Sequence, residues 1–151
     1  ISIIKALRGG HHISPLVQKL AFGNYNERFD DDLNDSARWL TTSKERRKVF
    51  HEDKLSGFLF TVSAMKDLVR MNRDCNLKRW YDAMPSSLPV LLVAGEDDPV
   101  GNYSKGVLEV EDGLRKRNIP VKCVIYKGAR HEILEDFTHD DVVRDILAFV
   151  E

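Results

Sequence analysis

Hydrophobic and polar positions alternate differently in the two parts of this chain. From residue 86 onward, an unbroken apolar run at 89–94 and a second β-type run at 121–126 are each followed by a segment in which apolar residues recur at a helical spacing. Because an unbroken apolar run is typical of a strand covered on both faces, and strands alternate here with helices, we expect two parallel strands. Helices are expected over about 103–117 and through 142–150, where the 3.6-residue period is clearest.

The first 85 residues show helical periodicity without strand-like runs. Asn and Asp dominate residues 24–35, which predicts a loop. Thr42 or Ser43 could cap one helix, and Thr61 or Ser63 another. The helices that we expect cover 13–22, about 43–51, about 60–69 and 77–84.

This order of elements predicts an α/β fold in which a helical region, residues 1–85, precedes a βαβα part, residues 86–151. A parallel pair of strands needs neighbours to bury both of its faces. We therefore expect further strands from a missing segment. The first residue is Ile rather than Met, so the reading frame is expected to begin upstream.

The composition of the chain limits the kinds of partner and the location that we expect. Lys and Arg number 23 against 24 Asp and Glu, and a net charge of −1 gives no electrostatic reason to expect nucleic acid. No run approaches the roughly 20 apolar residues of a membrane helix. The two cysteines form no C-x-x-C pair, and a reducing, cytoplasmic location is expected.

Polar residues follow both predicted strands directly. Asp97 and Asp98 come after the first strand, and His131 comes after the second. Because the carboxyl ends of parallel strands meet at one edge of a sheet, Asp98 and His131 should face the same crevice. A carboxylate that orients an imidazole is the acid–base part of a serine hydrolase. Alternatively, Asp97-Asp98-Pro99 is only a turn and His131 only a loop histidine.

Other catalytic motifs are absent from the sequence. It has no G-x-S-x-G nucleophile motif, and Ser104 stands at the wrong spacing for one. It also lacks a phosphate-binding glycine loop and an H-E-x-x-H metal motif, so we expect neither cofactor nor metal.

Several segments of the chain resemble a known protein family. The segments LPVLLVAG (88–95), DPV (98–100) and GARHEILE (128–135) resemble the C-terminal part of the serine aminopeptidase-like α/β-hydrolases, which include lysophospholipase and monoacylglycerol lipase types. The stretches HISPL (12–16), LAFG (20–23) and GFLFT (57–61) look like the helical cap of bacterial lysophospholipase-like members.

The resemblance implies the following roles. Asp98 aligns with the acid of the triad, with Asp97 as the fallback, and His131 aligns with the base. Arg130 and Glu132 flank the base and would hold its loop. The order serine, acid, histidine is that of α/β-hydrolases, so the serine and the oxyanion hole would belong to a missing N-terminal half. The chain alone is then expected to be inactive.

The expected substrate is a small-molecule carboxylic ester, lysophospholipid-like or monoacylglycerol-like. Large apolar side chains of the cap would lie over the active-site mouth and favour acyl chains; they are Leu16, Leu20, Phe22, Phe29, Trp39, Phe58, Phe60 and Met65. Alternatively, these residues form the core of the cap. Peptidase activity and a non-catalytic module that binds a partner or ligand are the competing functions.

Overall fold

The computed structural model describes residues 1–151 as seven helices and two strands. The elements in chain order are α1 (Ser2–Arg8), α2 (Pro15–Phe22), α3 (Lys44–Glu52), α4 (Val62–Cys75), α5 (Lys78–Asp82), β1 (Val90–Gly95), α6 (Lys105–Arg115), β2 (Val121–Tyr126) and α7 (His139–Val150). Both predicted strands are confirmed, and the predicted helices lie within three residues of their expected ends, except that α4 continues six residues past its expected end at residue 69. Helix α1 was not expected.

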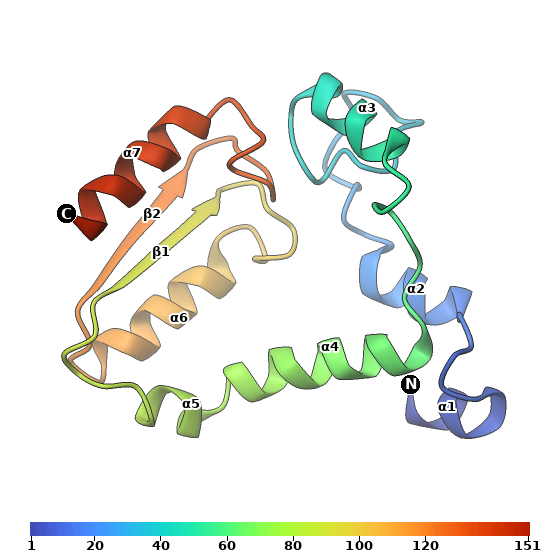
Figure 1. Cartoon of the computed structure of the whole chain (residues 1–151), viewed down its shortest axis with the longest axis horizontal. Coiled ribbons are helices and arrows are strands. Elements are labelled where there is room, and N and C mark those ends of the chain that lie inside the picture. Colours follow the sequence, from blue (N-terminus) through green and yellow to red (C-terminus); the bar gives the residue numbers. More distant parts are fainter.

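The sheet consists of β1 and β2, paired in parallel with Val90 opposite Val121 and Gly95 opposite Tyr126. Helix α6 connects the two strands and lies along the sheet on the side away from α7 (Figure 1). Tyr126, Ala129 and Val142 form the buried core on the α7 side. The structure therefore has the helix–sheet–helix layering expected for an α/β fold, with a sheet of two strands.

Local side-chain bonds determine where the N-terminal helices begin. The hydroxyl groups of Ser43 and Thr61 accept hydrogen bonds from the backbone N–H groups of Arg46 and Ala64, as capping residues do. Both were among the predicted caps. Ser14 caps α2 in the same way and was not predicted, although Pro15 in the first turn is typical of a helix start.

The long loop between α2 and α3 lies beside the carboxyl ends of both strands (Figure 1). It pairs there with the segment after β2, because the backbone N–H of His131 donates to Trp39 O at 3.3 Å and that of Glu132 to Leu40 O at 2.7 Å. This pairing joins the helical and α/β parts at the predicted crevice. The division at residues 85 and 86 remains a prediction.

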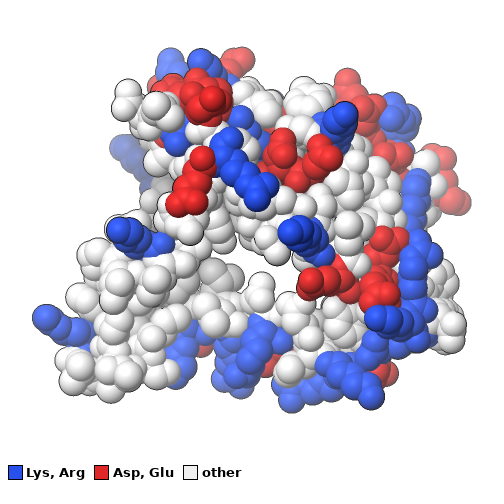
Figure 2. Space-filling model, turned by 180° about the vertical axis from the view of Figure 1, so that it is seen from behind, with Lys and Arg blue, Asp and Glu red and all other residues white.

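The corner formed by α1 and α2 has little charge on the face shown in Figure 2, where Lys, Arg, Asp and Glu lie mainly elsewhere. Four exposed aliphatic side chains belong to this corner: Ile3, Leu7, Leu16 and Leu20. None of the helices combines the length and the apolar character that a membrane crossing needs.

Candidate active site

Asp98 and His131 meet at the carboxyl edge of the sheet, as their positions after β1 and β2 predict. Nδ1 of His131 lies 3.0 Å from Oδ2 of Asp98, although the residues are 33 positions apart. The Asp98 side chain is only 10% exposed, whereas that of His131 is 37% exposed. A buried carboxylate thus accepts the Nδ1–H bond, and Nε2 of the imidazole has no hydrogen-bond partner in the chain.

Backbone bonds of the loop after β1 fix the direction of Asp98. Its Oδ1 accepts the N–H of Val100 at 2.8 Å, and its carbonyl accepts the N–H of Tyr103 at 2.8 Å. Asp97, the fallback acid, makes no side-chain bond to His131, and its backbone N–H donates to Ala129 O at 2.9 Å. The geometry favours Asp98 as the partner of the imidazole.

Two backbone features bring the loops together. A Cβ at Gly95 would collide with the carbonyl oxygens of Ala129 and Arg130, so only glycine permits this close approach. Asn102, Tyr103 and Ser104 all have left-handed backbone angles, with φ of 51°, 54° and 70°. Such conformations are costly for residues other than glycine and often occur at functional sites.

The segment before α3 supplies the second neighbour of the imidazole. The ring of Trp39 packs against that of His131 with centroids 5.1 Å apart and planes 40° apart. Tyr25 in turn packs edge-on against Trp39, also with centroids 5.1 Å apart. Sequence reasoning placed Trp39 in the cap but did not assign it to the base, because an aromatic residue in an irregular loop shows no periodicity.

Buried arginines hold the loop of Trp39 against the loop of His131. Nη1 of Arg130 donates to Arg38 O at 2.7 Å and to Thr41 O at 3.3 Å. Nη2 of Arg130 binds Asp31 at 2.9 Å, and Nη1 of Arg47 binds the other oxygen of Asp31 at 2.8 Å. The expectation that Arg130 holds the base loop agrees with these bonds.

Asp136, which follows His131 in the chain, also joins the loop of His131 to the loop of Trp39. Sequence reasoning did not identify it. Its Oδ2 accepts the backbone N–H groups of Thr42 at 3.1 Å and of Arg130 at 3.3 Å, and its Oδ1 binds the Thr42 hydroxyl. Glu132 contributes through its backbone bond to Leu40. Partial burial raises the pKa of the Glu132 carboxyl, although the neighbouring His131 acts in the opposite direction.

Arg47 pairs with two carboxylates, Asp31 at 2.8 Å and Asp35 at 2.6 Å, and both have lowered pKa values. Burial alone would raise the pKa of Asp31, but hydrogen bonds and charges from Arg130 and Arg47 outweigh it and lower that pKa. Burial would also raise the pKa of Asp35. The hydrogen bonds from His51 and from the N–H of Ala37, together with the charge of Arg47, outweigh burial and lower that pKa. The network therefore depends on negative charge at both positions.

A mostly apolar cavity of about 350 Å³ opens beside the imidazole. Its lining consists of Ala21, Phe22, Tyr25, Trp39, Met65, Leu68, Val69, Asn72, Val100 and His131. Of the large apolar residues expected at the mouth, Phe22, Trp39 and Met65 line this cavity. Phe29 instead packs beneath the guanidinium of Arg130, with the ring centroid 4.1 Å away, and Leu16, Leu20 and Phe58 are exposed.

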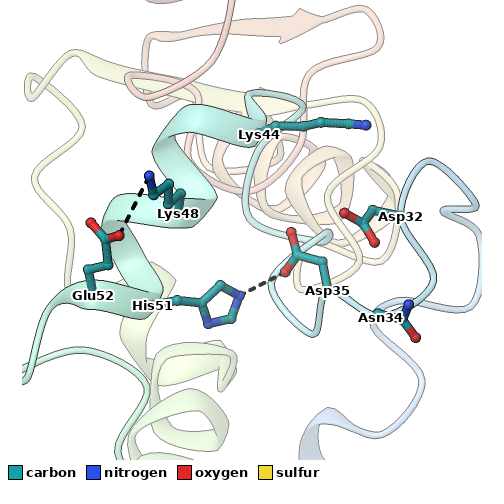
Figure 3. Close-up of a pocket in the computed structure, with 7 residues that line it drawn as sticks. All are labelled: Asp32, Asn34, Asp35, Lys44, Lys48, His51 and Glu52. Carbon is teal, nitrogen blue, oxygen red and sulfur yellow. Dashed lines mark hydrogen bonds and ion pairs between the residues drawn. The ribbon is translucent and has the colours of Figure 1, made fainter.

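A separate pocket between α3 and the loop that precedes it has no hydrophobic lining (Figure 3). Two of its three carboxylates already have basic partners, because Asp35 binds His51 at 2.8 Å and Glu52 lies 3.8 Å from Lys48. No group of three or more His, Cys, Asp or Glu side chains in the chain could hold a metal ion. The cavity beside His131 is therefore the better candidate for a substrate site.

Comparison with known proteins identifies relatives. The family described as "Serine aminopeptidase, S33" matches residues 6–138. A highly thermostable carboxyl esterase from Bacillus coagulans, solved with glycerol, superimposes with a TM-score of 0.89 at 24% identity, over 99% of this chain and 49% of the esterase. A structure described as a lipase in its open form gives a TM-score of 0.87 at 27% identity, over 99% and 48% of the two chains. No curated protein matches. The chain spans about half the length of these two solved structures.

Proposed function

Because the chain belongs to the serine aminopeptidase S33 family of α/β-hydrolases, we propose that it supplies the acid and the base of a Ser-His-Asp triad. Asp98 is the acid, His131 is the base, and the nucleophilic serine comes from a segment outside these 151 residues. The observation that carries the proposal is the 3.0 Å bond between Nδ1 of His131 and the buried carboxylate of Asp98.

This bond suits the imidazole for accepting a proton. With Nδ1–H donating to Asp98, the free Nε2 carries the lone pair that can take the proton of a serine hydroxyl. The serine oxygen then attacks the ester carbonyl carbon, and His131 returns the proton to the departing alcohol as the acyl-enzyme forms. Water, deprotonated by the same Nε2, releases the acid and regenerates the serine.

The substrate that we propose is a carboxylic ester with a hydrophobic acyl group, such as a lysophospholipid or a monoacylglycerol. Support comes from the aromatic and aliphatic lining of the cavity beside His131, whose volume lies in the range of small-molecule sites. The comparisons add that one similar structure is described as a carboxyl esterase and another as a lipase. The two unpaired cysteines support a cytoplasmic location.

Two other functions compete. Peptidase activity is favoured by the description of the family as serine aminopeptidases. A non-catalytic module that binds a partner or ligand is favoured by the lack of a G-x-S-x-G motif in the sequence. Parallel assays with a p-nitrophenyl acyl ester and an aminoacyl p-nitroanilide distinguish the esterase from the peptidase.

Labelling with a fluorophosphonate probe, read by intact mass, tests the proposal. We expect label on a segment or polypeptide other than this 17.3 kDa chain, and we expect His131→Ala to abolish it. Absence of label from every polypeptide that copurifies would favour the binding module. Label on this chain itself would show that one of its own serines is the nucleophile; Ser104→Ala would then test the serine nearest Asp98 in the sequence.

A further inference from the structure

Trp39 contacts His131 in two ways. Its ring packs on the imidazole with centroids 5.1 Å apart, and its carbonyl oxygen accepts the backbone N–H of His131 at 3.3 Å. We propose that Trp39 is a positioning residue that holds the imidazole plane in line with Asp98; this inference rests on the proposed triad.

The bond to Asp98 cannot fix the imidazole alone. The torsion between Cβ and the ring of a histidine has a broad profile, so one hydrogen bond at Nδ1 leaves the ring free to rock about the bond axis. The His131 side chain is 37% exposed and has no other hydrogen bond, which leaves few contacts to limit that motion. The indole of Trp39, which packs against the imidazole at an angle of 40°, restricts this remaining freedom.

Trp39 is itself held from three directions. Its backbone N–H donates to Oδ1 of Asn26 at 2.9 Å, and its ring packs edge-on against Tyr25. The Arg130 guanidinium binds the carbonyls of Arg38 and Thr41, on either side of Trp39. Since Arg130 also precedes His131 in the chain, one residue ties the base loop to the backbone around its packing partner.

Trp39 also lines the apolar cavity, which offers a simpler role as a wall for the substrate. The two roles predict different results. A wall residue acts on substrate binding and leaves the bond between His131 and Asp98 unchanged. A positioning residue acts on turnover, because a small misplacement of a catalytic group costs about tenfold to a hundredfold in rate.

The test compares Trp39→Met, which removes the ring, with Trp39→Phe, which keeps an aromatic face. Trp80→Met is the matched control, because Trp80 packs on Tyr81 in α5 and makes no contact with the site. Ester hydrolysis is measured in the enzyme assembled with its nucleophile-bearing segment. Thermal unfolding of each variant shows whether it folds.

We expect Trp39→Met to lower kcat about tenfold to a hundredfold, Trp39→Phe to lower it less because it keeps an aromatic face, and Trp80→Met to stay close to the parent. The downfield proton resonance of the His131–Asp98 hydrogen bond, recorded on this chain by NMR, should broaden or vanish only in Trp39→Met. A higher KM with unchanged kcat and an intact resonance would overturn the positioning role and leave Trp39 as a wall.

Two further results keep this inference separate from the proposed function. If His131→Ala hydrolyses esters as well as the parent, the proposed triad fails, whatever Trp39 does. If His131→Ala is inactive but Trp39→Met behaves like the parent, only the positioning role fails. Should Trp39→Met not fold, cross-relaxation between the ring protons of Trp39 and His131 in the parent chain decides, since its absence contradicts the packing.

Discussion

The carboxylate of Asp98 binds Nδ1 of His131 at 3.0 Å, while the neighbouring Asp97 makes no bond to the imidazole. Adjacent aspartates in one turn thus have different positions relative to the base. Asp98 is nearly buried and its second oxygen accepts the N–H of Val100. This difference provides a matched pair of substitutions for testing the triad.

We predict that Asp98→Asn lowers kcat of the assembled enzyme by roughly 10⁴-fold, because an amide cannot hold the imidazole in the required tautomer. Asp97→Asn should retain nearly full activity. Steady-state kinetics on a p-nitrophenyl ester measures both. Equal losses in the two variants would mean that the turn as a whole, and not the Asp98 carboxylate, supports activity.

The sequence predicted this pair because its signal is local. A strand-like run followed directly by polar residues indicates both a parallel strand and the edge where ligands bind, so Asp98 and His131 could be located together. Thr61 and Ser43 were predictable as caps for the same reason, since a cap depends on residues three positions away.

The surroundings of the pair could not be predicted in the same way. Trp39, Asp31 and Asp136 lie in irregular segments, and their partners are up to 99 positions away in the chain. No periodicity marks such contacts, which arise only when the loop before α3 packs on the loop after β2. The face of α4 that lines the cavity is an exception, because Met65, Leu68 and Val69 recur at helical spacing.

We predict that removing Arg130 destabilises the contact between the α3 region and the segment after β2 more than removing the exposed Arg46, although both residues link these two parts. Arg130→Met breaks three bonds of a nearly buried guanidinium and leaves Asp31 with one partner fewer. A hydrogen bond made by a charged group is worth about 1.5–3 kcal/mol, and the guanidinium of Arg130 makes its bonds largely out of solvent, whereas an exposed pair such as Arg46–Glu135 is worth at most about 1 kcal/mol.

Hydrogen–deuterium exchange measures this difference locally. In Arg130→Met we expect faster exchange at the amides of His131 and Glu132, whose acceptors are Trp39 O and Leu40 O. Arg46→Met should exchange like the parent at these amides. Unchanged protection in Arg130→Met would show that the loops remain paired without the guanidinium.

We predict that acid weakens the contact between the loop of Trp39 and the loop of His131. The pKa values of Asp31 and Asp35 are lowered in the folded chain, so their stabilising effect is present above the unfolded pKa of about 4 and is lost as the pH falls through the folded values. In a Trp80→Phe background, Trp39 is the only tryptophan, and its fluorescence should change in this acid range.

Asp31→Asn should remove the contribution of Asp31 to that acid transition, because the side chain no longer titrates. Asp30→Asn, an exposed neighbour in the same loop, serves as the control and should behave like the parent. A transition of the same size and midpoint in Asp31→Asn would assign the acid sensitivity to other carboxylates.

Tyr126 at the end of β2 should make the stability of the fold fall at high pH, whereas Asp31 and Asp35 make it fall at low pH. Burial first, and then the hydrogen bond to Asp145 at 2.9 Å, raise the pKa of its phenol to about 12. Because the folded pKa is raised, the stabilisation is fully present below the unfolded value of about 10 and is lost as the pH rises toward 12.

Ultraviolet titration should show one tyrosine ionising last, and Tyr126→Phe should remove that step while Tyr81→Phe does not. Ionisation of Tyr126 near pH 10, the ordinary value of a phenol, would mean that its ring is not packed against Val142 and that the bond to Asp145 does not form.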